Sequence, residues 1–352
     1  MTAIDAFPVT TPTETAPAPP ARAAARSVRA PRAHQHDPLH DAVRDEAHGS
    51  THDPSLDHGS PEHAGRLAAA RAQVAARYGV SPRRADTAAP QVSATVAAAA
   101  DLPRSVLDVQ LGHRSVRRFL PGPLAPSVLP TLVAAAQSAP TTSNLQLWSV
   151  VAITDTARLA RVAELSGQQE HVRDAPLLLV WVADVARVRT LAERRNTAVH
   201  ATGYLETTVT AYLDAALAAQ NAMVAAESLG LGTVYLGGVR DRPEALAAEL
   251  RLPRGTAPVV GLVVGRPDPA ARPGRVKPRL PQAVVLHHET YDTARQLRPL
   301  AAYERRMTDF YREEGMDGGW IGRTLTRLRG PGSLRGRERL RSALATLGLP
   351  SW

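Results

Sequence analysis

The stretch that most constrains the fold is residues 209 to 232, VTAYLDAALAAQNAMVAAESLGLG, because it is apolar on nearly every side of a helix. A helix with this pattern is buried on most of its faces. The apolar run is interrupted by Asp214, Gln220, Asn221 and Glu227, so a membrane span is not expected. We therefore predict a long central helix in the core of a globular domain, and we expect it to pack against a second subunit as well.

Four short apolar segments predict the strands of a central sheet. They are rich in β-branched and aromatic residues, as buried strands are. The predicted strands are residues 148–154, 176–183, 232–238 and 258–265. Helical patterns separate them, at residues 103–113, 125–140, 154–167 and 242–250. Because strands and helices alternate without a strict βαβ count, the pattern favours an α/β or α+β class with a central sheet.

The two ends of the chain differ in composition from its middle. Residues 1–64 are rich in proline, alanine, serine, histidine and charge, which predicts a disordered tail. Seven of the 12 histidines lie in this tail, so a metal-binding role stays open beside the simpler interpretation of a solvated segment. We expect residues 65–104 to form a helical N-terminal extension, residues 105–290 the core, and residues 291–352 a helical C-terminal excursion and candidate lid.

The composition excludes several classes of site and partner. The sequence has no cysteine, which excludes disulfides, thiolate metal sites and cysteine nucleophiles. The net charge of +9 arises from arginines that are spread along the chain rather than gathered in runs, so nucleic-acid binding is not favoured. Because we find no secretory signal and no membrane-spanning run, we expect a cytoplasmic protein.

Two basic clusters lie at junctions between predicted elements. The first, in LGHRSVRRFLPG, contains Arg114, Arg117 and Arg118. The second, Lys277 and Arg279 in VKPRLP, is stiffened by its prolines. Lys277 is the only lysine among 42 basic residues, which suggests a position where a bulkier guanidinium would not serve. Cations on stiff loops suit a phosphate, although each cluster by itself also fits ordinary surface charge.

Two further motifs offer contacts to a ligand. The segment PTTSNLQLW, residues 140–148, places hydroxyl and amide side chains in a turn, where they could recognise a polar heterocycle or simply cap the turn. The segment VYLGG, residues 234–238, ends a strand with two glycines, which let the backbone approach a flat ligand closely. It lacks the G-x-G-x-x-G spacing of a dinucleotide-binding fold, and no P-loop lysine follows it.

In this order, HRSVR, TTSNLQ, GLGTVYLGG and VKPRLP resemble the FMN-dependent nitroreductase and flavin reductase family, and most of all its larger branch of major oxygen-insensitive nitroreductases. The resemblance covers residues 105–315. It implies an α+β fold with a central mixed β-sheet flanked by helices and a long buried central helix. It also implies a homodimer that binds FMN at the subunit interface.

The resemblance implies a set of cofactor-binding residues and no catalytic side chain, since the chemistry takes place on FMN. His113, Arg114 and Ser115 match the family's segment near the FMN phosphate. Lys277 and Arg279 match a second phosphate-binding pair, which would explain why a lysine is present here.

Other positions match the family's contacts along the flavin. Arg117 matches a residue that faces the pyrimidine edge, and Gln169 matches a glutamine that hydrogen-bonds the flavin. Two further segments match family features: one is a serine-rich turn along the cofactor, and the other is a backbone segment that passes the reactive N5 of the flavin ring. They are Thr141, Thr142 and Ser143 for the turn, and Tyr235, Leu236, Gly237 and Gly238 for the backbone.

The function implied by the resemblance is that of an NAD(P)H-dependent oxidoreductase. In such enzymes FMN accepts a hydride from NADPH or NADH and passes reducing equivalents to a quinone, a nitroaromatic compound or free flavin. Two alternatives stay open. One is a family member with another outcome, such as reductive dehalogenation or flavin fragmentation, and the other is a non-catalytic binding or regulatory protein with the same fold.

One segment departs from the resemblance. The larger branch carries clustered arginines in a mobile C-terminal loop that hold the 2′-phosphate of NADPH, whereas this sequence has Glu313, Glu314 and Asp317 there. Arg323 and Arg327 follow the acidic residues and could substitute only if the loop folds differently. The choice between NADPH and NADH therefore stays open.

Overall fold

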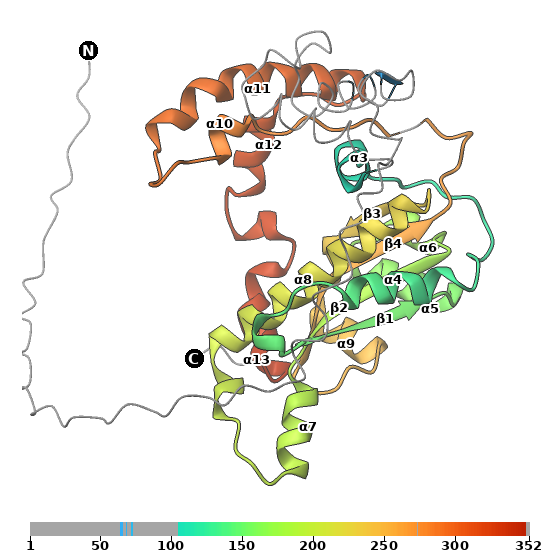
Figure 1. Cartoon of the computed structure of the whole chain (residues 1–352), viewed down its shortest axis with the longest axis vertical. Coiled ribbons are helices and arrows are strands. Elements are labelled where there is room, and N and C mark those ends of the chain that lie inside the picture. Colours follow the sequence, from blue (N-terminus) through green and yellow to red (C-terminus); the bar gives the residue numbers. More distant parts are fainter. Residues whose placement is uncertain (1–63, 66–67, 69–71, 73–104, 273, 350–352) are drawn as a thin grey trace, which may run out of the picture. The chain divides into compact units, whose positions relative to one another are not determined.

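The computed structural model describes residues 64–65, 68, 72, 105–272 and 274–349, all of which belong to one compact unit, Pro54–Trp352 (Figure 1). The expected disordered tail and almost all of the expected helical extension over 65–104 lie outside the described residues. Among the described residues, none of the helices is both long enough and apolar enough to cross a membrane.

A four-stranded sheet forms the centre of this unit, in the order β1-β2-β4-β3. Its strands are β1 (Trp148–Ile153), β2 (Leu177–Asp184), β3 (Gly232–Leu236) and β4 (Thr256–Gly265). All three pairings between these strands are antiparallel. We expected a mixed sheet, and the parallel contribution is a single bridge between Ser115 and Thr233 at the outer edge of β3. The sheet therefore differs from the expectation in strand direction but not in its α+β class.

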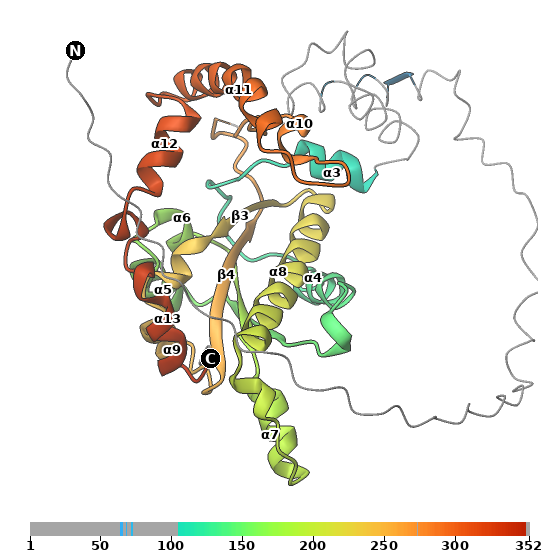
Figure 2. The ribbon, with the colours of Figure 1, turned by 90° about the vertical axis from the view of Figure 1, so that its left-hand side faces the viewer.

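One face of the sheet is covered by α4 (Val128–Gln137) and α8 (Leu205–Ser228), which pack on each other (Figure 2). Alternate residues of β2, Leu177, Leu179 and Trp181, join alanines of α8 in this layer. The small alanine side chains bring the α8 backbone close to the strands. Burial of each large side chain in such a layer stabilises the fold by about 1.5–3 kcal/mol.

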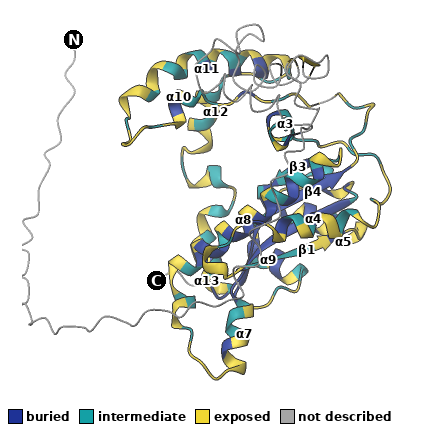
Figure 3. Ribbon diagram, viewed as in Figure 1, coloured by how far each residue is buried: buried dark blue, intermediate teal, exposed yellow. Residues whose placement is uncertain are grey.

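The opposite face is covered by α5 (Thr156–Leu165), α6 (Glu170–Arg173) and α9 (Pro243–Glu249). The intervening residues of β2, Leu178, Val180 and Val182, point into this second layer. Because β2 supplies apolar side chains to both faces, all its residues are buried (Figure 3). This explains why the segment 176–183 is a continuous apolar run rather than an alternating pattern.

The other helices lie outside these two layers. They are α3 (Val106–Gly112), α7 (Ala186–Arg194), α10 (Gln282–Val285), α11 (Ala294–Glu313), α12 (Trp320–Arg327) and α13 (Leu340–Thr346). Single 3₁₀ turns occur at η4 (Thr142–Asn144), η5 (His200–Gly203), η6 (Gly237–Arg240), η7 (Pro331–Leu334) and η8 (Arg337–Arg339). Helix α11 has its own small core, in which Tyr303, Met307, Phe310 and Tyr311 pack against Leu280, Met316 and Trp320.

The predicted long central helix is present, but its bounds lie about one helical turn earlier in the chain than predicted. It begins at Leu205 rather than at residue 209, and it ends at Ser228 rather than at residue 232. Gly230 ends the helix, since it adopts a left-handed φ of 77° and Leu231 N–H donates back to the Ala226 carbonyl at 3.0 Å. The remaining residues of the predicted stretch, from Gly232 on, belong to β3.

Candidate functional site

The two basic clusters, which are far apart in the sequence, meet in the structure. A Cβ atom on Gly274 would lie 3.0 Å from the Ser115 carbonyl oxygen, so the loop leading to Lys277 runs directly beside the first cluster. Burial lowers the pKa of Lys277, and the neighbouring charges of Arg117, Arg279 and Arg323 lower it further. Such crowding of cations is unfavourable in the absence of a counter-charge. An anion bound beside these cations would relieve their mutual repulsion.

The 113–118 segment is held against the edge of the sheet by three contacts. Val116 N–H donates to the Thr233 carbonyl at 2.8 Å, beside the bridge between Ser115 and Thr233. His113 Nδ1 lies 2.7 Å from Glu227 Oε1. Gly232 is needed at this point, because a Cβ there would lie 2.7 Å from Val116 Cβ. The side chains of Arg114 and Ser115 thus project from a firmly anchored segment.

The glycine pair at the end of β3 forms a close backbone contact. A Cβ on Gly238 would overlap the carbonyl oxygen of Ser166, whereas a Cβ on Gly237 would meet only the ends of two arginine side chains. The same Ser166 carbonyl accepts a hydrogen bond from Gln169 Nε2 at 3.1 Å. Gln169 and Gly238, two of the predicted site residues, therefore lie at one place.

The residues Tyr235 and Leu236 contribute to the site through their backbone. Leu236 is buried in the layer beneath α5 and α9. The Tyr235 hydroxyl donates to Gln220 Oε1 at 3.3 Å, and both burial and the charge of Glu227 raise its pKa. Neither side chain is directed to the cation cluster by any described contact, so their predicted role as a backbone segment is compatible with the structure.

Two arginines at the glycine pair were not predicted from the sequence. Arg240 Nη2 and Arg337 Nη1 each lie 3.7 Å from the position that a Cβ on Gly237 would occupy. Burial and the charge of Arg337 lower the pKa of Arg240. Arg337 is held by Asp241, with Nε 2.6 Å from Oδ1. Nothing in the sequence distinguished these two from the many other arginines, because Arg337 reaches the site only through the fold of the C-terminal segment.

His171 is a third residue that sequence reasoning missed. Its Nε2 atom is buried and has no hydrogen-bond partner among the described residues. Burial lowers its pKa, and so does the charge of Arg117, which also lowers the pKa of Lys277. A buried polar atom without a partner next to a cation cluster fits the binding of a polar ligand.

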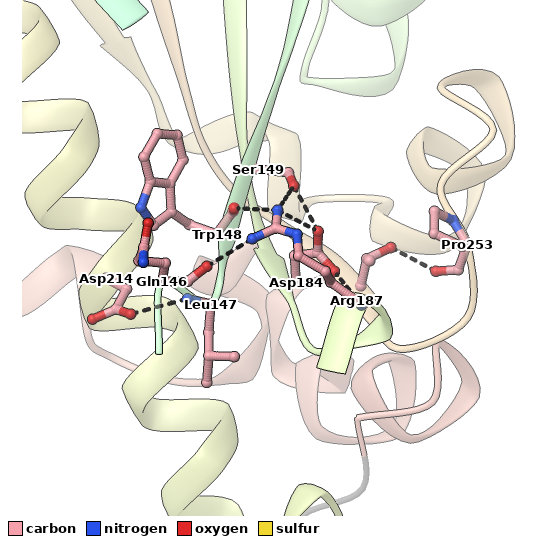
Figure 4. Close-up of polar contacts among 9 residues, drawn as sticks. Gln146, Leu147, Trp148, Ser149, Asp184, Arg187, Asp214 and Pro253 are labelled. Carbon is pink, nitrogen blue, oxygen red and sulfur yellow. Dashed lines mark hydrogen bonds and ion pairs between the residues drawn. The ribbon is translucent and has the colours of Figure 1, made fainter. Parts of the chain in front are cut away.

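The turn at Thr141, Thr142 and Ser143 lies elsewhere in this chain. Thr142 N–H donates to Asp214 Oδ1 at 3.1 Å, and Leu147 N–H donates to Asp214 Oδ2 at the same distance. Figure 4 shows the continuation of this contact region, in which Arg187 donates to the carbonyl oxygens of Gln146 and Trp148.

Helix α8 separates this turn from the cation cluster. Asp214 lies near the middle of α8, and Glu227 lies in its last turn. At about 1.5 Å per residue the two acids are about 20 Å apart along the helix axis. Within one chain, the described contacts therefore do not bring the turn to the other predicted site residues.

The acidic residues that depart from the family pattern are paired with arginines of the proline-rich loop. Glu313 forms an ion pair with Arg275, and Glu314 lies 3.7 Å from Arg272. On the other side of this segment, the Arg323 guanidinium lies over the Tyr311 ring at 4.5 Å. The acids thus neutralise two guanidinium groups close to the Lys277 loop, while Arg323 stays among the cations.

Comparison with known proteins identifies the family of the chain. Residues 111–266 match the family model described as "Nitroreductase family", and residues 277–351 match "Nitroreductase family, C-terminal domain". An FMN reductase [NAD(P)H] of Bacillus subtilis is 38% identical over 201 residues, which are 56% of this chain and 79% of the relative. An oxygen-insensitive NADPH nitroreductase of Salmonella typhimurium is 35% identical over 209 residues, 59% of this chain and 83% of the relative.

A solved structure shows the same fold. The NADPH:FMN oxidoreductase from Vibrio harveyi complexed with NAD+ superimposes with a TM-score of 0.62 and 30% identity. The alignment covers 69% of this chain and 97% of that chain. The part of this chain outside the alignment is comparable in size to the N-terminal region that the structure does not describe.

Proposed function

Because the chain belongs to the nitroreductase family, we propose that it is an FMN-dependent NAD(P)H oxidoreductase whose cation cluster holds the phosphate of FMN. The observation that carries the assignment of the site is that Lys277 and Arg323 lie over the same Tyr311 ring, at 5.9 Å and 4.5 Å from its centroid. The charges of Arg117, Arg279 and Arg323 also lower the pKa of Lys277. An FMN phosphate is dianionic near neutral pH and would relieve this repulsion. The proposal also explains why this position is a lysine in a chain whose other basic residues are arginines. An ammonium group is more compact than a guanidinium and would fit more easily beside the neighbouring arginines.

The residues present fit the remainder of the cofactor. Gly238 packs closely on the Ser166 carbonyl, which also accepts a hydrogen bond from Gln169. Two residues after Gln169, the buried His171 Nε2 has no hydrogen-bond partner among the described residues. When bound, FMN supplies hydride chemistry, accepting two electrons from NADPH or NADH and donating them to a nitroaromatic compound or to free flavin. Arg240 and Arg337, at Gly237, supply positive charge in a partly buried region. Such charge favours an anionic acceptor or donor in the same place.

We also propose that the enzyme is a homodimer formed along α8. Four large apolar side chains of this helix are exposed, at every fourth residue: Leu205, Val209, Leu213 and Leu217. A continuous apolar stripe of this kind marks an interaction surface. A second copy is the occupant that fits, because the predicted Thr141–Ser143 turn lies too far from the cation cluster of its own chain. A partner's turn could complete the site from across the interface.

The donor and the location of the enzyme follow from the same proposal. Glu313 and Glu314 occupy the segment in which the larger branch of the family holds the NADPH 2′-phosphate, and they neutralise Arg272 and Arg275. NADH, which lacks that phosphate, is therefore proposed as an accepted donor beside NADPH. Since both nicotinamide donors are cytoplasmic metabolites, we place the enzyme in the cytoplasm.

Charge reversal in the cluster tests the assignment of the phosphate site. We expect Arg114→Glu and Lys277→Glu each to raise the FMN dissociation constant by about tenfold to a hundredfold. A change of this size corresponds to the loss of one charge-assisted hydrogen bond. Flavin absorbance that stays with the protein through gel filtration measures this directly. Arg194→Glu, an exposed arginine on α7, is the matched control and should remain yellow. Retention of flavin by both cluster variants would refute the assignment of the site.

A further inference from the structure

The carboxylate of Glu227 connects two segments of the candidate site, and nothing in the function proposed above requires it. Its Oε1 atom accepts a hydrogen bond from Thr233 Oγ1 at 2.6 Å and lies 2.7 Å from His113 Nδ1. Thr233 is fully buried, and the Glu227 side chain is only 12% exposed. A single oxygen atom therefore joins the last turn of α8, the first half of β3 and the segment that carries Arg114 and Ser115.

The position of this acid is unfavourable for the helix alone. Glu227 lies one residue before the end of α8, where the helix dipole disfavours a negative charge. Its burial adds a desolvation cost, which hydrogen bonds from other groups must offset. An apolar helix that ends on a small alanine would avoid both costs. The contacts that Glu227 makes outside its own helix are therefore the physical reason for it.

Both partners of Glu227 lead into the site. From His113 the chain continues to Arg114, Ser115 and Arg117, which belong to the cation cluster or stand beside it. From Thr233 the strand continues to Tyr235 and the Gly237–Gly238 pair. The Val116–Thr233 backbone hydrogen bond runs parallel to this link and keeps the two segments in register.

We propose that Glu227 is a positioning residue for FMN binding: it sets the place of the phosphate-binding segment relative to the backbone that passes the flavin ring. This inference rests on the proposed function. Glu227 does not touch the cofactor in this proposal, and it acts through His113 and Thr233. Loss of its charge leaves the fold in place but loosens the fit of the two segments to one ligand.

The first test compares two carboxylates in the full-length protein. We expect Glu227→Gln to raise the FMN dissociation constant at least about tenfold, as expected for loss of a charged hydrogen-bond partner. FMN fluorescence, which rises on release, measures the constant. Glu249→Gln is the control, since Glu249 is also a carboxylate near the end of a helix and pairs with Arg158 and Arg161 of α5, none of which is a predicted site residue. The control should lose thermal stability without a change in FMN affinity.

The second test separates positioning from general stability. Thr233→Val keeps the shape of the buried side chain but removes the hydroxyl, whereas Thr233→Ser keeps the hydroxyl and loses a methyl group. We expect the valine variant to bind FMN about tenfold more weakly and the serine variant to stay within about threefold of the parent. Thr233→Ser should nevertheless lower the melting temperature, because a buried methyl group is lost.

The outcomes are distinct. Parent-like FMN affinity in Glu227→Gln and Thr233→Val would overturn the positioning role, and so would an equal loss in Thr233→Ser. If Glu227→Gln does not fold, the FMN affinities of Thr233→Val and Thr233→Ser test the positioning role instead. A parent protein that binds no FMN would instead refute the proposed function itself.

Discussion

Individual side chains in this protein have roles that depend on what the fold brings next to them. Lys277 is an ordinary lysine in the sequence, whereas in the structure desolvation and the charges of Arg117, Arg279 and Arg323 lower its pKa. Gly238 and Gly237 are adjacent and identical, yet only the first is in contact with another backbone segment. The residue type alone does not distinguish these cases, because burial and neighbouring charge set both the pKa and the tolerance to substitution.

The glycine pair provides a prediction at this scale. We expect Gly238→Ala to lower the free energy of unfolding by about 1–3 kcal/mol, the usual cost of overpacking, and to weaken FMN binding. Gly237→Ala should fold with the stability of the parent, since its methyl group would meet only mobile guanidinium ends at 3.7 Å. Thermal unfolding of the two variants side by side is the measurement. Equal stability of both would contradict the contact with Ser166.

At the scale of elements, α8 has two functions that divide its surface. Its alanine side, with Ala218, Ala219 and Ala222, packs on the sheet. The opposite stripe, which includes Leu213, faces outward. Large apolar side chains are costly to expose to water, so this stripe, from Leu205 to Leu217, is the surface at which we propose that the dimer forms.

Disruption of this stripe tests the dimer. We expect Leu213→Glu to raise the dimer dissociation constant by at least about a hundredfold, because it would place an unpaired charge in the interface. FMN should be lost together with the dimer if the Thr141–Ser143 turn acts from the partner. Analytical ultracentrifugation with detection of the flavin follows both properties. Leu191→Glu on α7 is the control, and a dimeric Leu213→Glu would argue against this interface.

The turn between α11 and α12 provides a second prediction for an element. Replacing Glu313 and Glu314 by glutamine frees Arg272 and Arg275 from their ion pairs. We expect kcat/KM for NADPH to rise about tenfold relative to that for NADH, since the 2′-phosphate then meets free guanidinium groups. Steady-state kinetics with both donors measure the ratio. Glu193→Gln on α7 is the control and should leave this ratio unchanged. An unchanged ratio in the Glu313 and Glu314 variant would show that the 2′-phosphate binds elsewhere.

At the scale of the whole molecule, all the proposed FMN contacts lie in the part of the chain that the family models match. The matched ranges are residues 111–266 and 277–351. The expected tail and extension precede them. The cofactor site and the interface stripe therefore belong to the same folded unit.

Truncation tests this division. We expect a protein that begins at Gly65 to bind FMN and reduce a nitroaromatic compound with a kcat/KM within about twofold of the full chain. The reason is that the tail carries neither site residues nor predicted core. A large loss of FMN affinity on removal of residues 1–64 would instead assign the histidine-rich segment a direct part in the site.

The sequence by itself determined the types of the main elements and the family. Periodicity and residue type predicted the four strands, the core helix and most of the helices around them, because burial of apolar side chains is a local pattern. The four motifs in order predicted the family and the cation cluster. Short helices such as α7 were missed, since an amphipathic segment of this length has a weak pattern.

Only the tertiary structure decided which of these residues meet. It brought Arg117 to Lys277, linked Glu227 to His113 and Thr233, and carried Arg337 from the C-terminal segment to Gly237. It also placed the Thr141–Ser143 turn beside Asp214, near the middle of α8 and about 20 Å along the helix axis from Glu227. These relations depend on long-range packing of the chain, and electrostatic interactions act across space rather than along the sequence.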